Sequence, residues 1–185
     1  MKNVFFSFAL SCTASFAFAE CPAPPDHSAR LQGLIDAVQT APDETAAHLI
    51  SNDMWDVWAD APDDTSQTML DDGLVRRAGF DLDGALKAFE QLIAYCPNYA
   101  EGYNQRAFIL FIKKDYEPAL ADLERTIELS PQHIAAIAGK ALTLIGLKRD
   151  EEAQIVLREA LALNPWLKER RFLTGGDSPK PKTDL

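Results

Sequence analysis

The sequence predicts an all-α fold, a solenoid of helix-turn-helix units repeated in tandem. Prolines recur with a spacing of 34 residues, and three further series of residues keep the same spacing. Two of these series consist of small residues and one of large apolar residues. The four series are Pro97, Pro131 and Pro165; Ala85, Ala119 and Ala153; Gly73, Ala107 and Ala141; and Phe89, Leu123 and Leu157. Parallel series with one period indicate a tandem repeat, and this period is typical of a helix-turn-helix unit.

Residues 1–19 read as a secretory signal peptide. Lys2 supplies a positive start, an apolar stretch follows, and Ala17-Phe18-Ala19 ends it with small residues where signal peptidase cleaves. We therefore expect cleavage after Ala19 and an exported, periplasmic protein. The stretch is too short to span a membrane and no second long apolar run follows, so we expect no membrane insertion after cleavage. Cys21 leaves a lipid anchor open, although Glu20 stands where a lipoprotein signal has a small residue.

Two cysteines, Cys21 and Cys96, remain in the mature chain after Cys12 leaves with the signal. In an exported protein such a pair is typical of one disulfide, here joining the N-terminal arm to the end of a repeat helix. Closing so long a loop stabilises the fold by about 4 kcal/mol in the chain-entropy model. The alternative is a small buried side chain at Cys96 and a free thiol at Cys21.

Acidic residues dominate the N-terminal third of the chain. The formal net charge is −10, and Arg30 is the only basic residue between Glu20 and Asp72. Binding to a nucleic-acid backbone requires a basic face, so we expect no nucleic-acid partner. The acidic arm suits either a basic partner or, as charge runs usually do, a solvated face.

Residues 20–65 are expected to form this acidic arm and a degenerate helical pair. Prolines keep residues 20–29 extended, and apolar residues at helical spacing then mark two short helices, the second ending near Ala59. Trp55 lies about half a turn away from the apolar stripe of the second helix. It either anchors a partner or covers the neighbouring helix. The two stripes are Leu31, Leu34, Ile35 and Val38, and then Ala46, Ile50, Met54, Val57 and Trp58.

Three full repeats follow, at residues 66–99, 100–133 and 134–167. Each contains a helix A, a turn and a helix B that ends before its proline. The small residues let helices A and B approach closely, and the large apolar residue fills the space between repeats.

The segments Gly102-Tyr103-Asn104-Gln105-Arg106-Ala107 and Asp115-Tyr116-Glu117-Pro118-Ala119-Leu120 resemble helix A and the turn of the tetratricopeptide repeat family. The resemblance covers the three repeats and implies a right-handed α-solenoid, here of an exported bacterial type. The chain departs from the family at Asp72, Arg106 and Lys140, where the family often has leucine. The small-residue and proline series stay intact, so the implied fold stands.

The resemblance also implies which side chains line the inner groove, since helix A supplies them in the family. Transferred position by position, these are Gln67, Leu70, Leu74 and Arg77 in the first repeat, Glu101, Asn104, Phe108 and Phe111 in the second, and Ala135, Ala138, Leu142 and Ile145 in the third. Such a wall is apolar, with Arg77, Glu101 and Asn104 as its polar groups. Family members that hold a C-terminal carboxylate use lysine and asparagine in the groove. Apart from Asn104 these are missing, so a carboxylate-binding co-chaperone is disfavoured.

The chain after the third repeat is expected to cap the solenoid. A short helix is predicted from Trp166 to Leu173, and its residues 168–173 extend past the third repeat. A basic cluster, Lys168, Arg170 and Arg171, supplies the polar face that a solenoid end requires, or else a docking patch. Residues 174–185 are expected to be a disordered tail.

No constellation of catalytic or metal-binding residues stands out. His27, His48 and His133 lie on separate elements, and none pairs with a cysteine or another histidine at metal-site spacing. Neither a nucleophile elbow nor a phosphate-binding loop is found. We therefore expect no enzyme activity, no cofactor and no bound metal.

The expected function is that of a periplasmic interaction scaffold, which binds an apolar segment of an envelope protein in its groove. Large exposed apolar patches are uncommon on monomers, so something should cover the groove. Two alternatives remain open. The chain fills the groove itself, with its N-terminal helix or the segment at Trp166, or two copies pair through it. Either would make the protein a structural subunit or homodimer without a peptide ligand.

Overall fold

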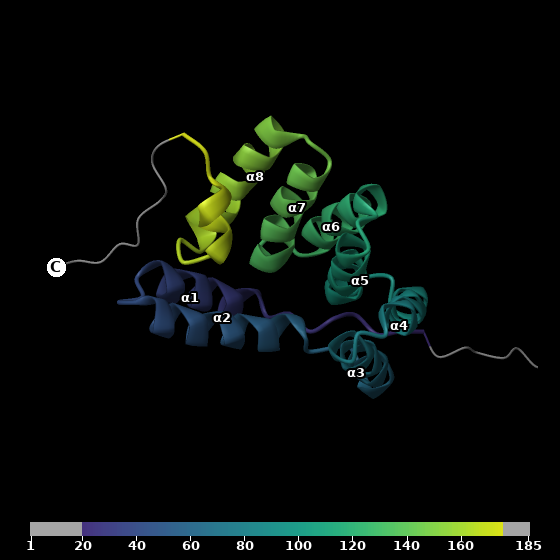
Figure 1. The fold of residues 1–185 in the computed structure, drawn as a ribbon. Helices are drawn as coiled ribbons and strands as arrows, with labels where there is room; N and C mark the ends of the chain where they lie inside the picture. The colour runs from purple at the N-terminus through teal and green to yellow at the C-terminus, as the bar shows by residue number, and fades with distance from the viewer. Residues whose placement is uncertain (1–19, 176–185) are drawn as a thin grey trace, which may run out of the picture.

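The computed structural model describes residues 20–175, which form eight α-helices and one 3-10 helix without a strand (Figure 1). The prediction of an all-α fold is confirmed. The expected signal peptide and the tail beyond Gly175 lie outside the described residues. Within the described chain, no helix has the length and apolar character needed to cross a membrane. The elements are α1 (Ser28–Gln39), α2 (Glu44–Trp58), α3 (Asp64–Ala78), α4 (Leu82–Tyr95), α5 (Ala100–Ile112), α6 (Tyr116–Leu129), α7 (Ile134–Gly146), α8 (Asp150–Leu163) and η1 (Lys168–Phe172).

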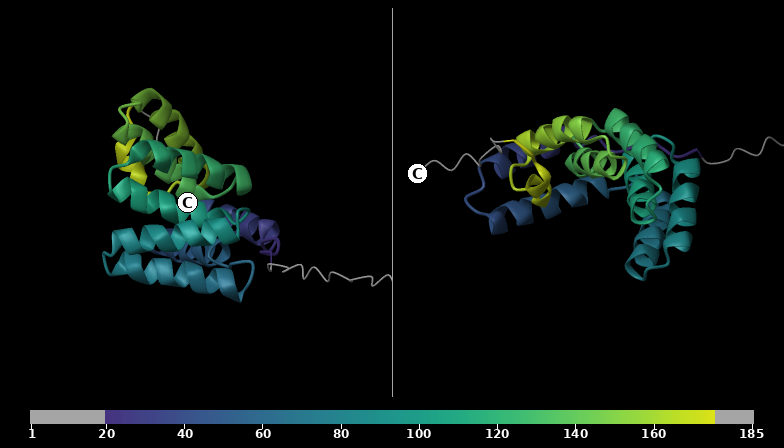
Figure 2. Two further views of the ribbon diagram at one scale, coloured as in Figure 1. Left: turned by 90° about the vertical axis from the view of Figure 1, so that its right-hand side faces the viewer. Right: turned by 45° about the horizontal axis from the view of Figure 1, so that its top comes forward.

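Six of these helices form the predicted solenoid. α3 and α4, α5 and α6, and α7 and α8 pack as pairs, and contacts of α4 with α5 and of α6 with α7 continue the stack. Figures 1 and 2 show a curved array, with α1 and α2 lying across it. The second helix of each pair ends two residues before its proline, at Tyr95, Leu129 and Leu163. The proline series therefore marks the loops between repeats.

The small-residue and large-residue series meet inside each pair. In the second pair Ala107 packs against Leu123 with both side chains buried, and the third pair repeats this arrangement. In the first pair a glycine replaces the alanine and a phenylalanine replaces the leucine. A Cβ atom on Gly73 would lie 2.3 Å from a ring carbon of Phe89. The larger ring therefore requires the smaller partner, because the interior is close-packed.

Gly73→Ala is expected to lower the free energy of unfolding by about 1–2 kcal/mol, because overpacking outweighs the better helix propensity of alanine. The double variant Gly73→Ala/Phe89→Leu reproduces the pair found in the second repeat and should recover most of the loss. Urea denaturation measures both. Gly33→Ala is the control, since Gly33 is exposed on α1 with open space around it. Equal losses at Gly33 and Gly73 would contradict the packing argument.

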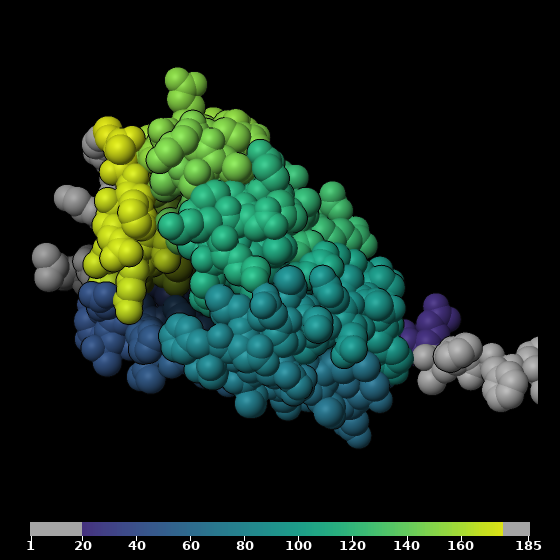
Figure 3. Space-filling model, turned by 45° about the vertical axis from the view of Figure 1, so that its right-hand side comes forward, coloured from purple at the N-terminus to yellow at the C-terminus, as the bar shows by residue number. Residues whose placement is uncertain are grey.

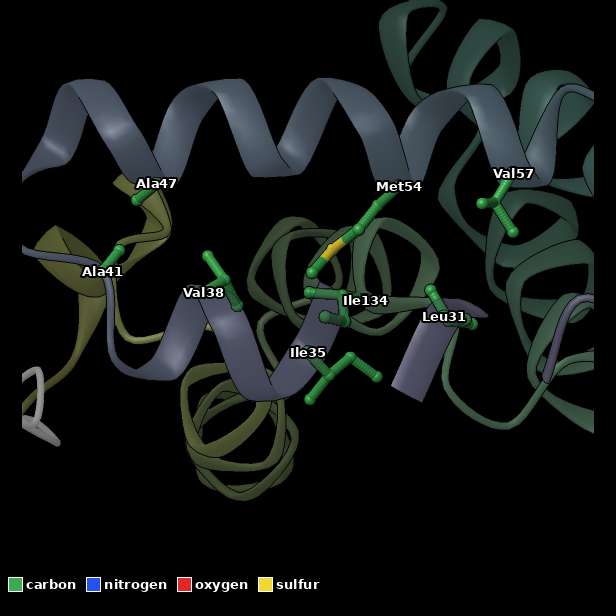
Figure 4. Packing of buried hydrophobic residues seen from close by; sticks show 8 residues of the cluster. All are labelled: Leu31, Ile35, Val38, Ala41, Ala47, Met54, Val57 and Ile134. Carbon is green, nitrogen blue, oxygen red and sulfur yellow. The ribbon is translucent and has the colours of Figure 1, made fainter. Parts of the chain in front are cut away.

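The N-terminal helices α1 and α2 do not stack on the first repeat. They pack on each other and against the third repeat, and Met54 and Val57 point from α2 towards α1 and Ile134 (Figure 4). Asp71, Asp72 and Val75 on α3 remain exposed, so α2 does not cover this face. The pair therefore does not occupy the place that a degenerate repeat before the first full one would take.

Residues 20–58, called the N-terminal strap below, contact all three loops that follow the second helix of a repeat. The strap therefore joins the three repeats along one edge of the array. Its contacts are the pair Cys21–Cys96, a hydrogen bond of 2.7 Å from Gln132 Nε2 to Gln32 Oε1, and one of 3.2 Å from Asn164 Nδ2 to Ser51 Oγ.

The two cysteines predicted to pair lie together at the start of the strap. Their Cα atoms are 5.2 Å apart, within the range that a disulfide spans. Cys96 is almost fully buried beside the core of the first repeat. This arrangement is compatible with the bond, whose formation in the cell stays a prediction.

The segment after α8 turns back over the strap. Trp166 and Leu167 pack against the apolar cluster of α1 and α2, and Arg170 lies 3.8 Å from Glu44 of α2. The expected capping helix from Trp166 to Leu173 is only the 3-10 helix η1. Its neighbours include the strap as well as the end of the array.

Candidate functional site

The inner side of the array holds an apolar cavity of about 330 Å³, called the inner cavity below. Figure 3 shows the surface hollowed where the yellow C-terminal segment and the blue α2 meet the green and teal repeats. α5 and α7 supply most of the wall. The structure brings together seven of the predicted groove residues here: Arg77, Asn104, Phe108, Phe111, Ala135, Ala138 and Leu142.

The inner cavity exists because α7 has small residues where it faces α5. Ala135, Ala138 and Gly139 line it, across from Phe108 and Phe111 on α5. Phe108 leaves 47% of its surface exposed. The result is a space bounded by aromatic rings on one helix and small residues on the other.

Five predicted groove residues do not line the inner cavity, and the prediction is corrected at these positions. Leu70 is fully buried in the core of the first repeat, and Leu74 packs against the same core. Ile145 packs against the core between α6, α7 and α8. Gln67 instead accepts a hydrogen bond from the backbone N–H of Ala61, and Glu101 is buried. The transfer of family positions assumes that every repeat presents helix A alike, whereas here packing turns these side chains away from the cavity.

Three residues from outside the helix pairs also line the inner cavity: Trp55 on α2, and Leu167 and Glu169 in the segment after α8. The repeat pattern cannot indicate them, because they do not belong to a helix A. Only the position of Trp55 off the apolar stripe of α2 signals a separate contact. Trp55 lies on the cavity rather than among the residues packed between α1 and α2. The chain thus covers part of its own groove and leaves the inner cavity open.

A buried polar network around Glu101 lies next to the inner cavity. The Glu101 carboxylate accepts hydrogen bonds from Asn104 Nδ2 at 3.1 and 3.2 Å, from His133 Nε2 at 2.7 Å, and from Gln105 Nε2. Gln105 Oε1 accepts one from Arg77. A buried carboxylate is costly unless donors compensate for lost water, and three side chains do so here. The network joins α3, α5 and the start of α7.

His133 is the N-cap of α7. Its Nδ1 accepts the backbone N–H of Ala136 at 3.2 Å, so the proton that faces Glu101 is carried by Nε2. The ring stacks on Trp58 with centroids 4.2 Å apart. His133 therefore has a structural role at the start of α7.

Arg77 brings positive charge to the wall of the inner cavity. Its guanidinium lies 5.1 Å from the ring centroid of Phe108, in a cation–π contact. Burial lowers the pKa of Arg77, while the nearby Glu101 raises it. An arginine pKa starts so far above neutrality that the side chain keeps its charge.

Among residues 20–175, no group of three histidine, cysteine, aspartate or glutamate side chains is placed to hold a metal ion. The histidines lie apart: His27 pairs with Asp60 at 2.6 Å, His48 is exposed on α2, and His133 is buried. What the inner cavity offers is apolar contact and hydrogen bonding, which is the chemistry of binding.

The second and third repeats match a known protein family. The family model described as "Tetratricopeptide repeat" matches residues 100–133 and 134–165. A TPR repeat-containing protein of Rhizobium etli is 26% identical over 125 residues, which cover 66% of this chain and 60% of that protein. The tetratricopeptide repeat protein 36 homolog of Nematostella vectensis is 40% identical over 66 residues, 36% of each chain. The chain thus spans less than two thirds of the length of either relative.

One solved structure with a similar fold is the first tetratricopeptide repeat domain of Spaghetti, bound to an HSP90 peptide. It matches with a TM-score of 0.55 and 19% identity, covering 56% of this chain and 82% of that chain. At this identity the likeness shows the fold alone.

Proposed function

The chain belongs to the tetratricopeptide repeat family, and from this premise we propose that it is an interaction scaffold whose inner cavity binds an apolar segment of another protein. The observation that carries the proposal is the half-exposed Phe108 on a wall shared with Phe111 and Leu142. Burying apolar surface contributes about 25 cal/mol for each Å² removed from water. A peptide that places apolar side chains in the inner cavity gains this free energy.

The Spaghetti domain, which shares the fold, was solved with a peptide bound, and this supports a peptide as the class of ligand. The wall of the inner cavity is mostly apolar, so it favours an apolar segment over a charged one. Arg77 and Asn104 stand at this wall and can orient the peptide by hydrogen bonds to its backbone.

A structural subunit with an occupied groove is the second candidate. Trp55 and Leu167 favour it, because side chains of the chain itself already cover part of the inner surface. In that case Phe108 serves packing, and a charge at this position destabilises the fold instead of removing a ligand.

Phe108→Glu is expected to weaken peptide binding by at least about thirtyfold while leaving the helical content unchanged, because a charge replaces an anchor ring. The probe is a phage-displayed library of random peptides selected on the wild-type protein, followed by calorimetry with the best binders. Ile155→Glu is the matched control, since Ile155 is exposed on α8 and does not line the inner cavity. Equal binding by both variants would contradict the site. Loss of the fold with Phe108→Glu would instead favour the structural subunit.

A periplasmic location and an envelope partner complete the proposal. Residues 1–19 read as a signal peptide, and the adjacent Cys21 and Cys96 suit an oxidising compartment. Mass spectrometry of protein released by osmotic shock tests this. A chain that begins at Glu20 is expected, and a cytosolic chain that retains residues 1–19 would contradict it.

A further inference from the structure

The turn between α3 and α4 exposes an aromatic ring in an unfavourable backbone conformation. Phe80 has a φ of 59° and leaves 85% of its surface exposed. The same turn position holds Lys114 with φ 62° and Lys148 with φ 64° in the other repeats. A bulky residue is a genuine outlier in this left-handed region, where glycine is at ease. Gly79, directly before it, has a φ of −81° and does not use its freedom.

Lysine and phenylalanine differ in the free-energy cost of exposing the side chain to water at this turn. A lysine keeps its charged end in water at such a tip, whereas a phenylalanine exposes a whole ring. The backbone conformation of Phe80 closes the end of α3, where the N–H groups of Phe80 and Asp81 donate to the carbonyls of Arg77 and Arg76 at 3.1 and 2.9 Å. The exposed ring has no such compensation, and a contact with another molecule would remove it from water.

The inner cavity is a matching receptor on the same chain. It is open, apolar and bounded by Phe108, Phe111 and Leu142, and its volume of about 330 Å³ accommodates a phenyl ring. Trp55 and Leu167 close part of it, and the space that remains suits one inserted apolar side chain, whether from a peptide or from a protruding turn.

Charge does not oppose the contact. Beside Phe80, Arg76 pairs with Asp72 at 2.7 Å and with Asp81 at 3.2 Å, so these three side chains carry one net negative charge and each lies in an ion pair. The ring can therefore enter an apolar pocket without stripping water from an unpaired ion.

We propose that a second copy of this chain occupies the inner cavity by inserting Phe80. The highly exposed Phe80 does not line its own inner cavity, so the contact joins two different surfaces of two molecules. Such a head-to-tail interface either closes into a ring or leaves one free tip and one free cavity at the ends of an open assembly, which grows with concentration.

Self-association then regulates the site. This consequence rests on the proposed function, because the same inner cavity cannot hold Phe80 and a peptide at once. A peptide that binds the cavity dissociates the assembly, and the assembly holds the cavity closed until a peptide arrives.

Sedimentation equilibrium of the disulfide-bonded mature chain tests the proposal. The wild type is expected to increase in mass with concentration, and Phe80→Lys, which installs the residue of the other two turns, is expected to stay monomeric. Val75→Lys is the control, since Val75 is 71% exposed on α3 but lies outside the turn. It should associate like the wild type.

Mixing two variants identifies the contact. Phe108→Glu keeps its Phe80 tip and Phe80→Lys keeps its cavity, so each alone is monomeric and the mixture forms a one-to-one dimer that grows no further. A monomeric wild type at every concentration, or association of Phe80→Lys alone, overturns the proposal. Peptides selected on the wild type distinguish failure of this proposal from failure of the proposed function. If the wild type is monomeric and the peptides bind Phe80→Lys but not Phe108→Glu, self-association is wrong and the peptide site is supported.

Discussion

Glu101→Ala is expected to lower the free energy of unfolding by about 3–5 kcal/mol, because it leaves three buried hydrogen-bond donors without their acceptor. The carboxylate is fully buried and accepts hydrogen bonds from Asn104, Gln105 and His133. Alanine leaves these donors facing a cavity. An unsatisfied buried donor costs about 1–3 kcal/mol, so the loss exceeds that of an ordinary hydrogen bond.

Urea denaturation followed by circular dichroism measures the effect. Glu128→Ala is the matched control, because Glu128 forms an exposed pair with Arg125 that should contribute about 0–1 kcal/mol. Glu101→Gln keeps the volume and one acceptor oxygen, so an intermediate loss is expected. If Glu101→Ala and Glu128→Ala unfold at the same urea concentration, the network does not stabilise the fold.

Cys21→Ser is expected to lower the free energy of unfolding by about 4 kcal/mol. The two cysteines are 75 residues apart in sequence, and a bond between them restricts the unfolded chain over that whole span. Reductant should lower the stability of the wild type by a similar amount and leave Cys21→Ser unaffected. The measurement is chemical denaturation of the two proteins with and without reductant. A wild type indifferent to reductant would show that the thiols do not pair.

The repeats could be predicted from the sequence because their interactions are local. A helix B packs on the helix A directly before it, so each proline and each small residue reports on a neighbour less than one repeat away. The first repeat has Gly73 and Phe89 where the second has Ala107 and Leu123, and the sequence shows these as two separate departures from the series. Only the contact between them shows that one departure compensates for the other.

The placement of the strap could not be predicted, because an apolar stripe tells which face of a helix is buried and not what covers it. Met54 and Val57 mark the buried face of α2, yet Ile134 in that cluster is more than two repeats further along the chain. The same limit applies to the candidate site. Family positions indicated Phe108 and Leu142. Trp55 and Leu167 line the inner cavity only because α2 and the segment after α8 fold back onto the array, which no repeat position reports.

The N-terminal strap has a consequence for how the protein unfolds. In a repeat array each unit contacts only its neighbours, so terminal units can fray while the centre stays folded. Here the contacts Cys21–Cys96, Gln32–Gln132 and Ser51–Asn164 couple the first repeat to the last. The first and last repeats therefore have contacts beyond their nearest neighbours, and neither behaves as a free end. The chain should therefore unfold in one cooperative transition, as a globular domain does, rather than repeat by repeat from its ends.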